Sequence, residues 1–295
     1  MRLIRVAGCA ALLLLTTAFG GSRATYALHG VESVRAQDLT APVRAGSKTT
    51  YFDVLRNLFP DLNDEGNAHS TVPIGSLSEP KKREAITGDI KFEFKPYWMN
   101  SEGRRLLLLW VDVKAEGANE ATPYEGEAVV LAAFALEPEP RLLDALDVKT
   151  DRFTGFWEDR PTLRLSPRDD ALVVYSTHWN AGESYVRLDM LFVDGGRFRK
   201  ITSFFMYNTQ GCGVGYTQAP SFRAVPEAGR KYPRVLVKVK LRKEPDGPEC
   251  DRRSAGYTKF YQGVYRWNAS KRRYEGGSRQ LDRLGEFNAK RVSSP

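Results

Sequence analysis

The sequence predicts an all-β fold of mainly antiparallel strands, with one short amphipathic helix near the N-terminus. From residue 89 onward, segments of alternating polar and apolar residues follow one another, rich in Val, Phe, Tyr and Leu. Gly, Pro, Asn and Asp separate these segments, and no helices alternate with them as they would in a parallel βαβ sheet. Three arrangements stay open: an antiparallel meander, a large two-sheet sandwich and an irregular propeller-like arrangement.

The composition is that of a folded globular protein. The chain has 295 residues, of which 42% are hydrophobic and 27% charged, which excludes collagen, coiled-coil and low-complexity classes. We expect one β-rich domain over 49–295, because a single β domain of this length is ordinary. If the domain divides, the glycine- and proline-rich stretch at 208–230 is where the sequence places the boundary.

The first 27 residues have the layout of a secretory signal peptide. Arg2 and Arg5 precede an apolar run at 9–19, and small residues follow it. Cleavage fits after Ala24 or after Ala27, and retention as an N-terminal anchor is the alternative. We therefore predict a periplasmic or secreted protein, with no transmembrane segment in its mature chain.

A polar stretch at 28–48 predicts a flexible mature N-terminus, and the helix follows it. Thr50 can cap this helix because Asp53 lies at its third position. Apolar residues then recur with helical spacing until Pro60, which predicts a helix at about 50–59.

Ten strands are expected after the helix. The turn residues Asp194, Gly195 and Gly196 supply the positive φ angles of one hairpin, and 268–271 form the turn of a second. Two prolines before 141–146 predict a turn of helix or a bend there. The strands are expected near 89–95, 104–114, 126–137, 162–166, 171–177, 184–193, 197–207, 232–242, 256–267 and 272–276.

Two cysteines remain after removal of the leader, Cys212 and Cys250. In an oxidising compartment an isolated pair predicts a disulfide, worth about 3 to 4 kcal/mol by the chain-entropy estimate. The alternative is that Cys212, between two glycines, is a nucleophile, which requires an accessible electropositive pocket.

Basic residues concentrate in the C-terminal part. Residues 230–295 hold 18 basic and 7 acidic residues, which suggests a face that meets an anionic envelope component such as a glycan or a lipid headgroup. Within it, alternation places Lys238, Lys240 and Arg242 on the outer face of one strand. No aromatic residues interleave with them on that strand face, which argues against nucleic acid. A charged edge strand that resists aggregation explains the same residues.

The densest set of polar and aromatic groups surrounds the end of the predicted strand at 171–177. His178 and Glu183 can transfer protons, and Trp179 can stack on a sugar or a base. Strand-end loops are where binding residues collect on a β scaffold. The alternative is a surface turn whose Trp packs inward.

Other chemistries lack the residues that they need. With three histidines and no G-x-S-x-G motif, the chain offers no recognisable serine-hydrolase or zinc pattern. An acidic stretch at 61–67 resembles half of a calcium loop, but Val72 stands where the bidentate Glu is required. We expect no metal and no cofactor.

These observations favour a non-enzymatic exported protein that binds or scaffolds an envelope or extracellular component. The alternative is a secreted or periplasmic hydrolase of glycans or another envelope polymer, with carboxylates as acid and base. No pattern in the sequence selects such a carboxylate pair.

Overall fold

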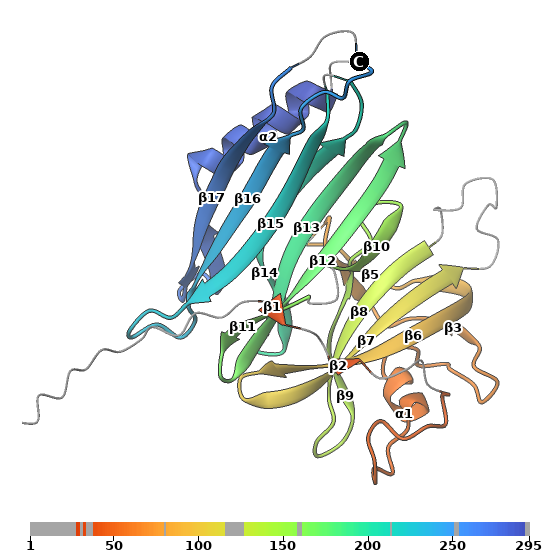
Figure 1. Ribbon diagram of the computed structural model, residues 1–295. Helices are drawn as coiled ribbons and strands as arrows, with labels where there is room; N and C mark the ends of the chain where they lie inside the picture. Colours follow the sequence, from red (N-terminus) through yellow and green to blue (C-terminus); the bar gives the residue numbers. More distant parts are fainter. Residues whose placement is uncertain are drawn as a thin grey trace, which may run out of the picture.

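The computed structural model describes residues 38–79, 81–115, 127–157, 161–212, 214–250 and 254–292, and the backbone of 28–29 and 32–33. These residues form two mostly antiparallel β-sheets and two short helices (Figure 1). The all-β prediction is confirmed. The predicted leader at 1–27 and most of 28–37 lie outside the described residues.

The smaller sheet is built around the hairpin of β6 (Thr87–Ser101) and β7 (Arg104–Ala115). Its strand order is β2-β6-β7-β8-β9-β4-β5, with β3 beside β6. All pairings are antiparallel except that of β4 with β9. The remaining strands are β2 (Glu32–Ser33), β3 (Ala68–Ser70), β4 (Ile74–Ser76), β5 (Arg83–Glu84), β8 (Glu127–Ala135) and β9 (Arg141–Asp147).

The expectation of a helical turn or bend at 141–146 was wrong, because this segment is β9. It pairs with β8, with Leu146 opposite Leu131, and in parallel with β4 through Gly75. Both partners are supplied by other parts of the chain. Pairing on two sides therefore overrides the local signal of the two preceding prolines.

The larger sheet has the order β1-β11-β12-β13-β14-β15-β16-β17-β18, with β10 beside β12. Strands β14 and β15 pair only at Thr209 and Tyr216. The sheet bends at this point, and its two halves enclose a common core. Its strands are β1 (Leu28–His29), β10 (Phe153–Phe156), β11 (Thr162–Ser166), β12 (Asp169–Asn180), β13 (Glu183–Asp194), β14 (Arg197–Thr209), β15 (Tyr216–Val225), β16 (Arg234–Lys243), β17 (Tyr257–Asn268) and β18 (Arg273–Gly276).

Each of the ten expected strands overlaps a strand of the structure. The β13–β14 hairpin turns through Gly195 and Gly196, with φ of 59° and 72°. Asp194 remains in β13, opposite Arg197, so the positive φ expected for it was wrong. Two consecutive positive φ angles match the twist of the flanking strands and suffice for the turn.

Three apolar clusters form the core. One lies between the smaller sheet and α1 (Tyr51–Leu55), and a second lies inside the bent larger sheet. The third joins the two sheets, because it combines Leu106 and Leu108 of β7 with Leu172 of β12 and Leu191 of β13. The sheets are therefore packed on each other through side chains of their central strands.

The two helices cover different parts of the fold. Helix α1 (Tyr51–Leu55) has a capping box between Thr50 and Asp53, and the chain continues as turns where the sequence predicted helix up to 59. Helix α2 (Arg279–Val292), which we did not predict, lies along β14 and β17. Among the described residues, no helix has the length and apolar character required to cross a membrane.

Candidate functional site

The predicted cluster around His178 lies at the tip of the β12–β13 hairpin. Asn180 pairs with Glu183, and the two residues between them, Ala181 and Gly182, have φ of 42° and 89°. This tight turn continues the antiparallel register to the end of the hairpin. Consequently His178 lies directly opposite Tyr185 on the neighbouring strand.

The imidazole of His178 is held by two contacts. Its ring stacks on that of Tyr185, with centroids 4.5 Å apart and planes at 13°. Its Nδ1 lies 2.5 Å from Oδ2 of Asp151, which precedes β10. Within the part of the chain that the structure describes, Nε2 has no hydrogen-bond partner, so this nitrogen is available to a ligand once Asp151 has fixed the ring.

Glu183 is held as an ionised acceptor. Its carboxylate accepts hydrogen bonds from the hydroxyls of Tyr185 and Tyr207, and these bonds hold its pKa below the usual value. The bond to Glu183 raises the pKa of Tyr185 to about 12, and burial together with Glu183 does the same for Tyr207. The two phenols therefore stay protonated, and the carboxylate stays charged, throughout the neutral range.

A cavity of about 570 Å³ opens beside these groups, and we call it the aromatic pocket. Trp179 is 57% exposed there, and Phe205 is 38% exposed. Phe153 supports the indole of Trp179 from outside the cavity, at a centroid distance of 4.8 Å. The pocket is lined by Arg152, His178, Trp179, Asn180, Tyr185, Phe205 and Val292.

Our sequence reasoning identified the hairpin residues of this pocket but missed those from other elements. Phe205 comes from β14, Val292 from the end of α2, and Phe153 from β10. Aromatic residues in alternating segments are usually core residues, so only the strand pairing shows that Phe153 and Phe205 lie near the hairpin, and only the packing of α2 shows it for Val292. The alternative of an inward-packed Trp179 does not hold, because more than half of its surface is exposed.

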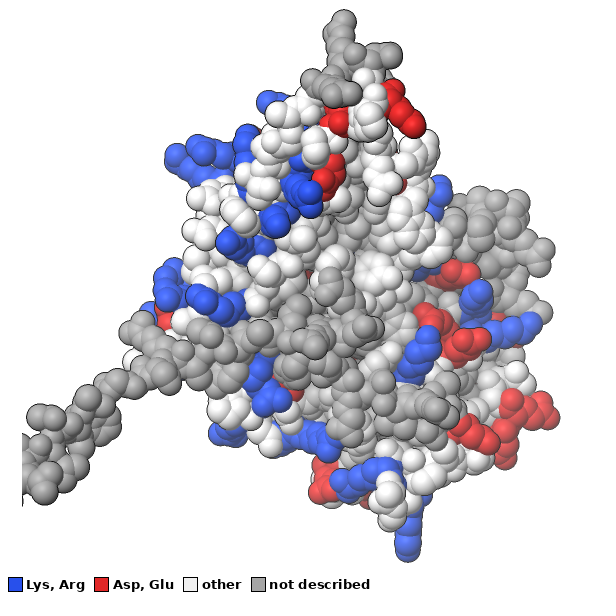
Figure 2. Space-filling model, viewed as in Figure 1, with Lys and Arg blue, Asp and Glu red and all other residues white. Residues whose placement is uncertain are grey.

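The predicted basic residues form a separate surface. On β16 the side chains of Val235, Val237, Val239 and Leu241 are fully buried, whereas Lys238, Lys240 and Arg242 are exposed. Figure 2 shows Lys and Arg side chains gathered over β15–β17. Lys238 lies 4.0 Å from the ring centroid of Phe260, and Arg242 pairs with Glu244 at 3.0 Å. None of these residues lines the aromatic pocket.

The predicted disulfide between Cys212 and Cys250 is confirmed, with a Cα–Cα distance of 5.5 Å. It ties the glycine-rich loop after β14 to the loop after β16. A sulfur in a disulfide is not a thiolate, so Cys212 does not act as a nucleophile in this state.

The acidic stretch at 61–67 forms a turn that uses its own oxygens. Asp61 accepts hydrogen bonds from the backbone N–H groups of His69 and Ser70, and Asn63 accepts from Glu65 and Asn67. Across the described parts of the chain, no three His, Cys, Asp or Glu side chains are grouped as metal ligands.

The aromatic pocket thus combines an exposed indole with a fixed imidazole, and one of its lining residues, Tyr185, donates a hydrogen bond to the ionised carboxylate of Glu183. Its function has to be inferred from these groups, because comparison of the chain with protein-family models, curated proteins and solved structures finds no match.

Proposed function

We propose that this chain is an exported, non-catalytic binding protein that holds an envelope or extracellular glycan in the aromatic pocket. The observation that carries the proposal is Trp179, which is 57% exposed although it lies in a cavity. A large aromatic side chain exposed beside hydrogen-bonding groups is typical of a binding site.

A sugar ring fits this combination of groups. A pyranose has an apolar face of C–H groups, which packs on an aromatic ring, and a rim of hydroxyls that need hydrogen-bond partners. Trp179 and Phe205 supply the aromatic surface, and Asn180 and His178 Nε2 supply polar atoms beside it.

Glycan binding is better supported than glycan hydrolysis. A glycosidase needs a carboxylic acid whose pKa is raised so that it can protonate the leaving group. Glu183 has the opposite environment, because two tyrosine hydroxyls stabilise its charged form. Export of the chain is supported by the Cys212–Cys250 bond, since disulfides persist in oxidising compartments.

Co-sedimentation with insoluble peptidoglycan and with chitin tests the proposal. Trp179→Ala should weaken binding to the polymer that sediments with the wild type by at least about tenfold, which corresponds to about 1.4 kcal/mol. Phe260→Ala is the matched control, because Phe260 is also exposed, at 54%, but lies on β17. Binding should persist in about 0.5 M NaCl, because stacking does not depend on charge.

A second candidate is supported by the basic surface of β16. If salt abolishes binding, and Lys240→Ala weakens it whereas Trp179→Ala does not, the chain binds an anionic component through Lys238, Lys240 and Arg242. That result would contradict the aromatic pocket as the glycan site.

A further inference from the structure

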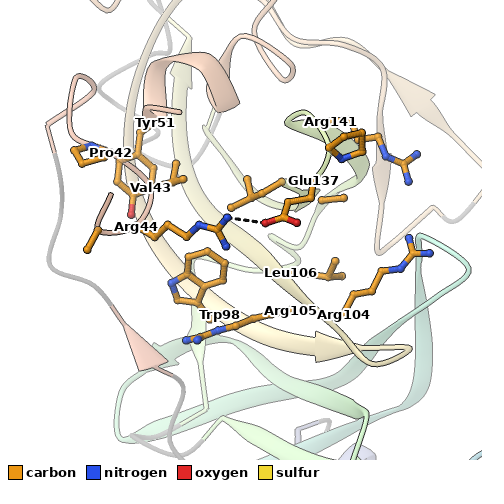
Figure 3. A pocket seen from close by; sticks show the side chains of 14 residues that line it. Pro42, Val43, Arg44, Tyr51, Trp98, Arg104, Arg105, Leu106, Glu137 and Arg141 are labelled. Atoms are coloured by element: carbon orange, nitrogen blue, oxygen red, sulfur yellow. Dashed lines mark hydrogen bonds and ion pairs between the residues drawn. The ribbon is translucent and has the colours of Figure 1, made fainter. Parts of the chain in front are cut away.

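A larger cavity, of about 950 Å³, lies at a corner of the smaller sheet (Figure 3). Its wall is formed by the start of β7, the end of β8, the start of β9 and the loop before α1. Four arginines and one glutamate surround it: Arg44, Arg104, Arg105, Arg141 and Glu137. We call it the arginine pocket.

The strand pairing explains why this corner is open. Pairing of β7 with β8 ends at Leu107 and Phe134, so residues 104–106 have partners in β6 but none in β8. On its other edge β8 stays paired with β9 as far as Ala135 and Arg141. The strands therefore diverge, and side chains from both lie around the gap between them.

The positive charge of the arginine pocket is only partly compensated. Arg44 pairs with Glu137 at 2.6 Å, but both side chains are more than half exposed, so this pair contributes little and can exchange with solvent. The guanidinium of Arg105 lies 4.9 Å from the ring centroid of Trp98. Within the described parts of the chain, neither Arg104 nor Arg141 has a hydrogen-bonding or ion-pair partner for its side chain.

The floor of the arginine pocket is apolar. Val43, Tyr51, Leu106 and Ala135 line it and are at least nine-tenths buried. In Figure 3 the indole of Trp98 lies between Arg44 and Arg105. The cavity thus offers cations at its rim and an apolar surface below them.

A second basic cavity, between β14 and β18, differs from the arginine pocket in that carboxylates of the chain compensate most of its positive charge. Its arginines and lysines are largely paired: Asp144 binds Arg83 and Arg197, and Glu275 binds Lys271 and Arg273. Internal carboxylates there take the place that an anionic ligand would occupy. Among the described residues that line the arginine pocket, Glu137 is the one carboxylate beside four arginines.

We propose that the arginine pocket binds an organic phosphate, with the phosphoryl group at Arg104 and Arg141 and the apolar part on the buried floor. A guanidinium presents a planar fork of N–H donors that matches phosphate oxygens, and a phosphoryl group has enough oxygens for more than one arginine. Inorganic phosphate alone fills only a small part of the cavity, and the apolar floor favours an ester over the free ion.

Isothermal titration of the chain with phenyl phosphate and with inorganic phosphate tests this proposal. Arg104→Ala/Arg141→Ala should weaken phenyl phosphate binding at least tenfold, and inorganic phosphate should bind more weakly than phenyl phosphate to the wild type. Arg279→Ala/Arg283→Ala removes the same charge from exposed positions of α2, to which no binding role is assigned, and should leave the affinity unchanged. Arg104→Lys/Arg141→Lys keeps the charge but removes the forks, and should bind with intermediate affinity.

Vesicles of phosphatidylcholine with and without phosphatidic acid identify the source of the phosphate. Binding of phenyl phosphate without vesicle binding indicates a soluble ester, whereas arginine-dependent binding to phosphatidic acid indicates a lipid headgroup. The proposal is overturned if the wild type binds neither probe, or if the Arg279/Arg283 control loses as much affinity as the Arg104/Arg141 variant. In a separate assay, the Arg104→Ala/Arg141→Ala variant should still bind peptidoglycan or chitin. A failure of phosphate binding can therefore be told apart from a failure of glycan binding in the aromatic pocket.

Discussion

At the scale of single residues, Asp194 shows how one buried carboxylate joins three segments of the larger sheet. It is 1% exposed at the end of β13 and accepts hydrogen bonds from Lys231, Tyr232 and Arg272. Burial by itself raises the pKa of this carboxyl, but the bonds from Lys231, Arg272 and Tyr232 outweigh burial and hold the pKa below its usual value. The charged form is therefore the one that stabilises the fold.

Asp194→Ala should lower the free energy of unfolding by about 2 to 3 kcal/mol, because it removes hydrogen bonds to charged groups and leaves the hydroxyl of Tyr232 unpaired. The folded-state pKa is depressed, so this stabilisation is present above the unfolded pKa of about 3.9 and is lost as the pH falls through the lower folded value. Urea unfolding at neutral and acidic pH measures the difference, which should shrink below about pH 4. Asp64→Ala, at an exposed position, is the control; equal midpoints for the two variants would contradict the assignment.

The sequence indicates which side chains lie close together where those residues are also close in the chain. His178, Trp179 and Glu183 are close in sequence and close in space, because a hairpin joins them. The arginine pocket was not predicted, since Arg104 at the start of β7 and Arg141 at the start of β9 are brought to one cavity only by the pairing of both strands with β8. Arginines at strand ends are common, and nothing local distinguishes these two.

At the scale of elements, β15 is a strand that the sequence did not predict. It contains Pro220, which cannot donate to a sheet ladder and which we took as a loop signal. In the structure Pro220 pairs with Val239 on one side, and on the other side β14 approaches β15 only at Thr209 and Tyr216. The proline is tolerated because its missing N–H faces the gap between β14 and β15.

Helix α2 was not predicted either, because its sequence lacks a regular apolar period. Its buried face includes Leu284 and, four residues later, Asn288, so the apolar period is broken by a polar residue. The amide of Asn288 accepts a hydrogen bond from Gln218 at 2.6 Å and donates one to the carbonyl oxygen of Phe205 at 2.9 Å. Side-chain amides thus bridge the gap between β14 and β15 where the backbone ladder is missing.

Asn288→Ala should destabilise the fold by about 1 to 3 kcal/mol, because Gln218 and the carbonyl of Phe205 are left without these partners in a buried setting. Arg283→Ala, on the exposed side of the same helix, should change stability by less than about 0.5 kcal/mol. Urea denaturation of both variants measures the two free energies of unfolding. If Asn288→Ala is as stable as Arg283→Ala, the amide does not anchor α2.

At the scale of the whole molecule, strand pattern predicted the all-β class but not the packing of the sheets. The run at 106–110 of β7 is buried on both faces, with Leu107 against the α1 side and Leu108 against the larger sheet. A continuous apolar run indicates burial on two sides without indicating what covers each side. The bend between β14 and β15 likewise depends on pairings far apart in the sequence.

The disulfide acts at this scale, because it joins loops on either side of β15 and β16. Cys212→Ala/Cys250→Ala should lower the free energy of unfolding by about 3 to 4 kcal/mol, since the unfolded chain gains the freedom of the opened loop. Wild-type protein unfolded in urea with a reductant should show the same loss. An unchanged urea midpoint in the double variant would contradict this role for the disulfide.

Tryptophan emission during titration with soluble fragments of peptidoglycan or chitin tests whether the aromatic pocket holds the glycan. We expect the emission of the wild type to shift to shorter wavelength as the sugar covers Trp179, which is 57% exposed. Trp179→Phe should show no such shift, although calorimetry should still record binding, because phenylalanine keeps an aromatic surface. A shift of equal size in Trp179→Phe, or binding without any shift in the wild type, would contradict the aromatic pocket as the site that holds the glycan.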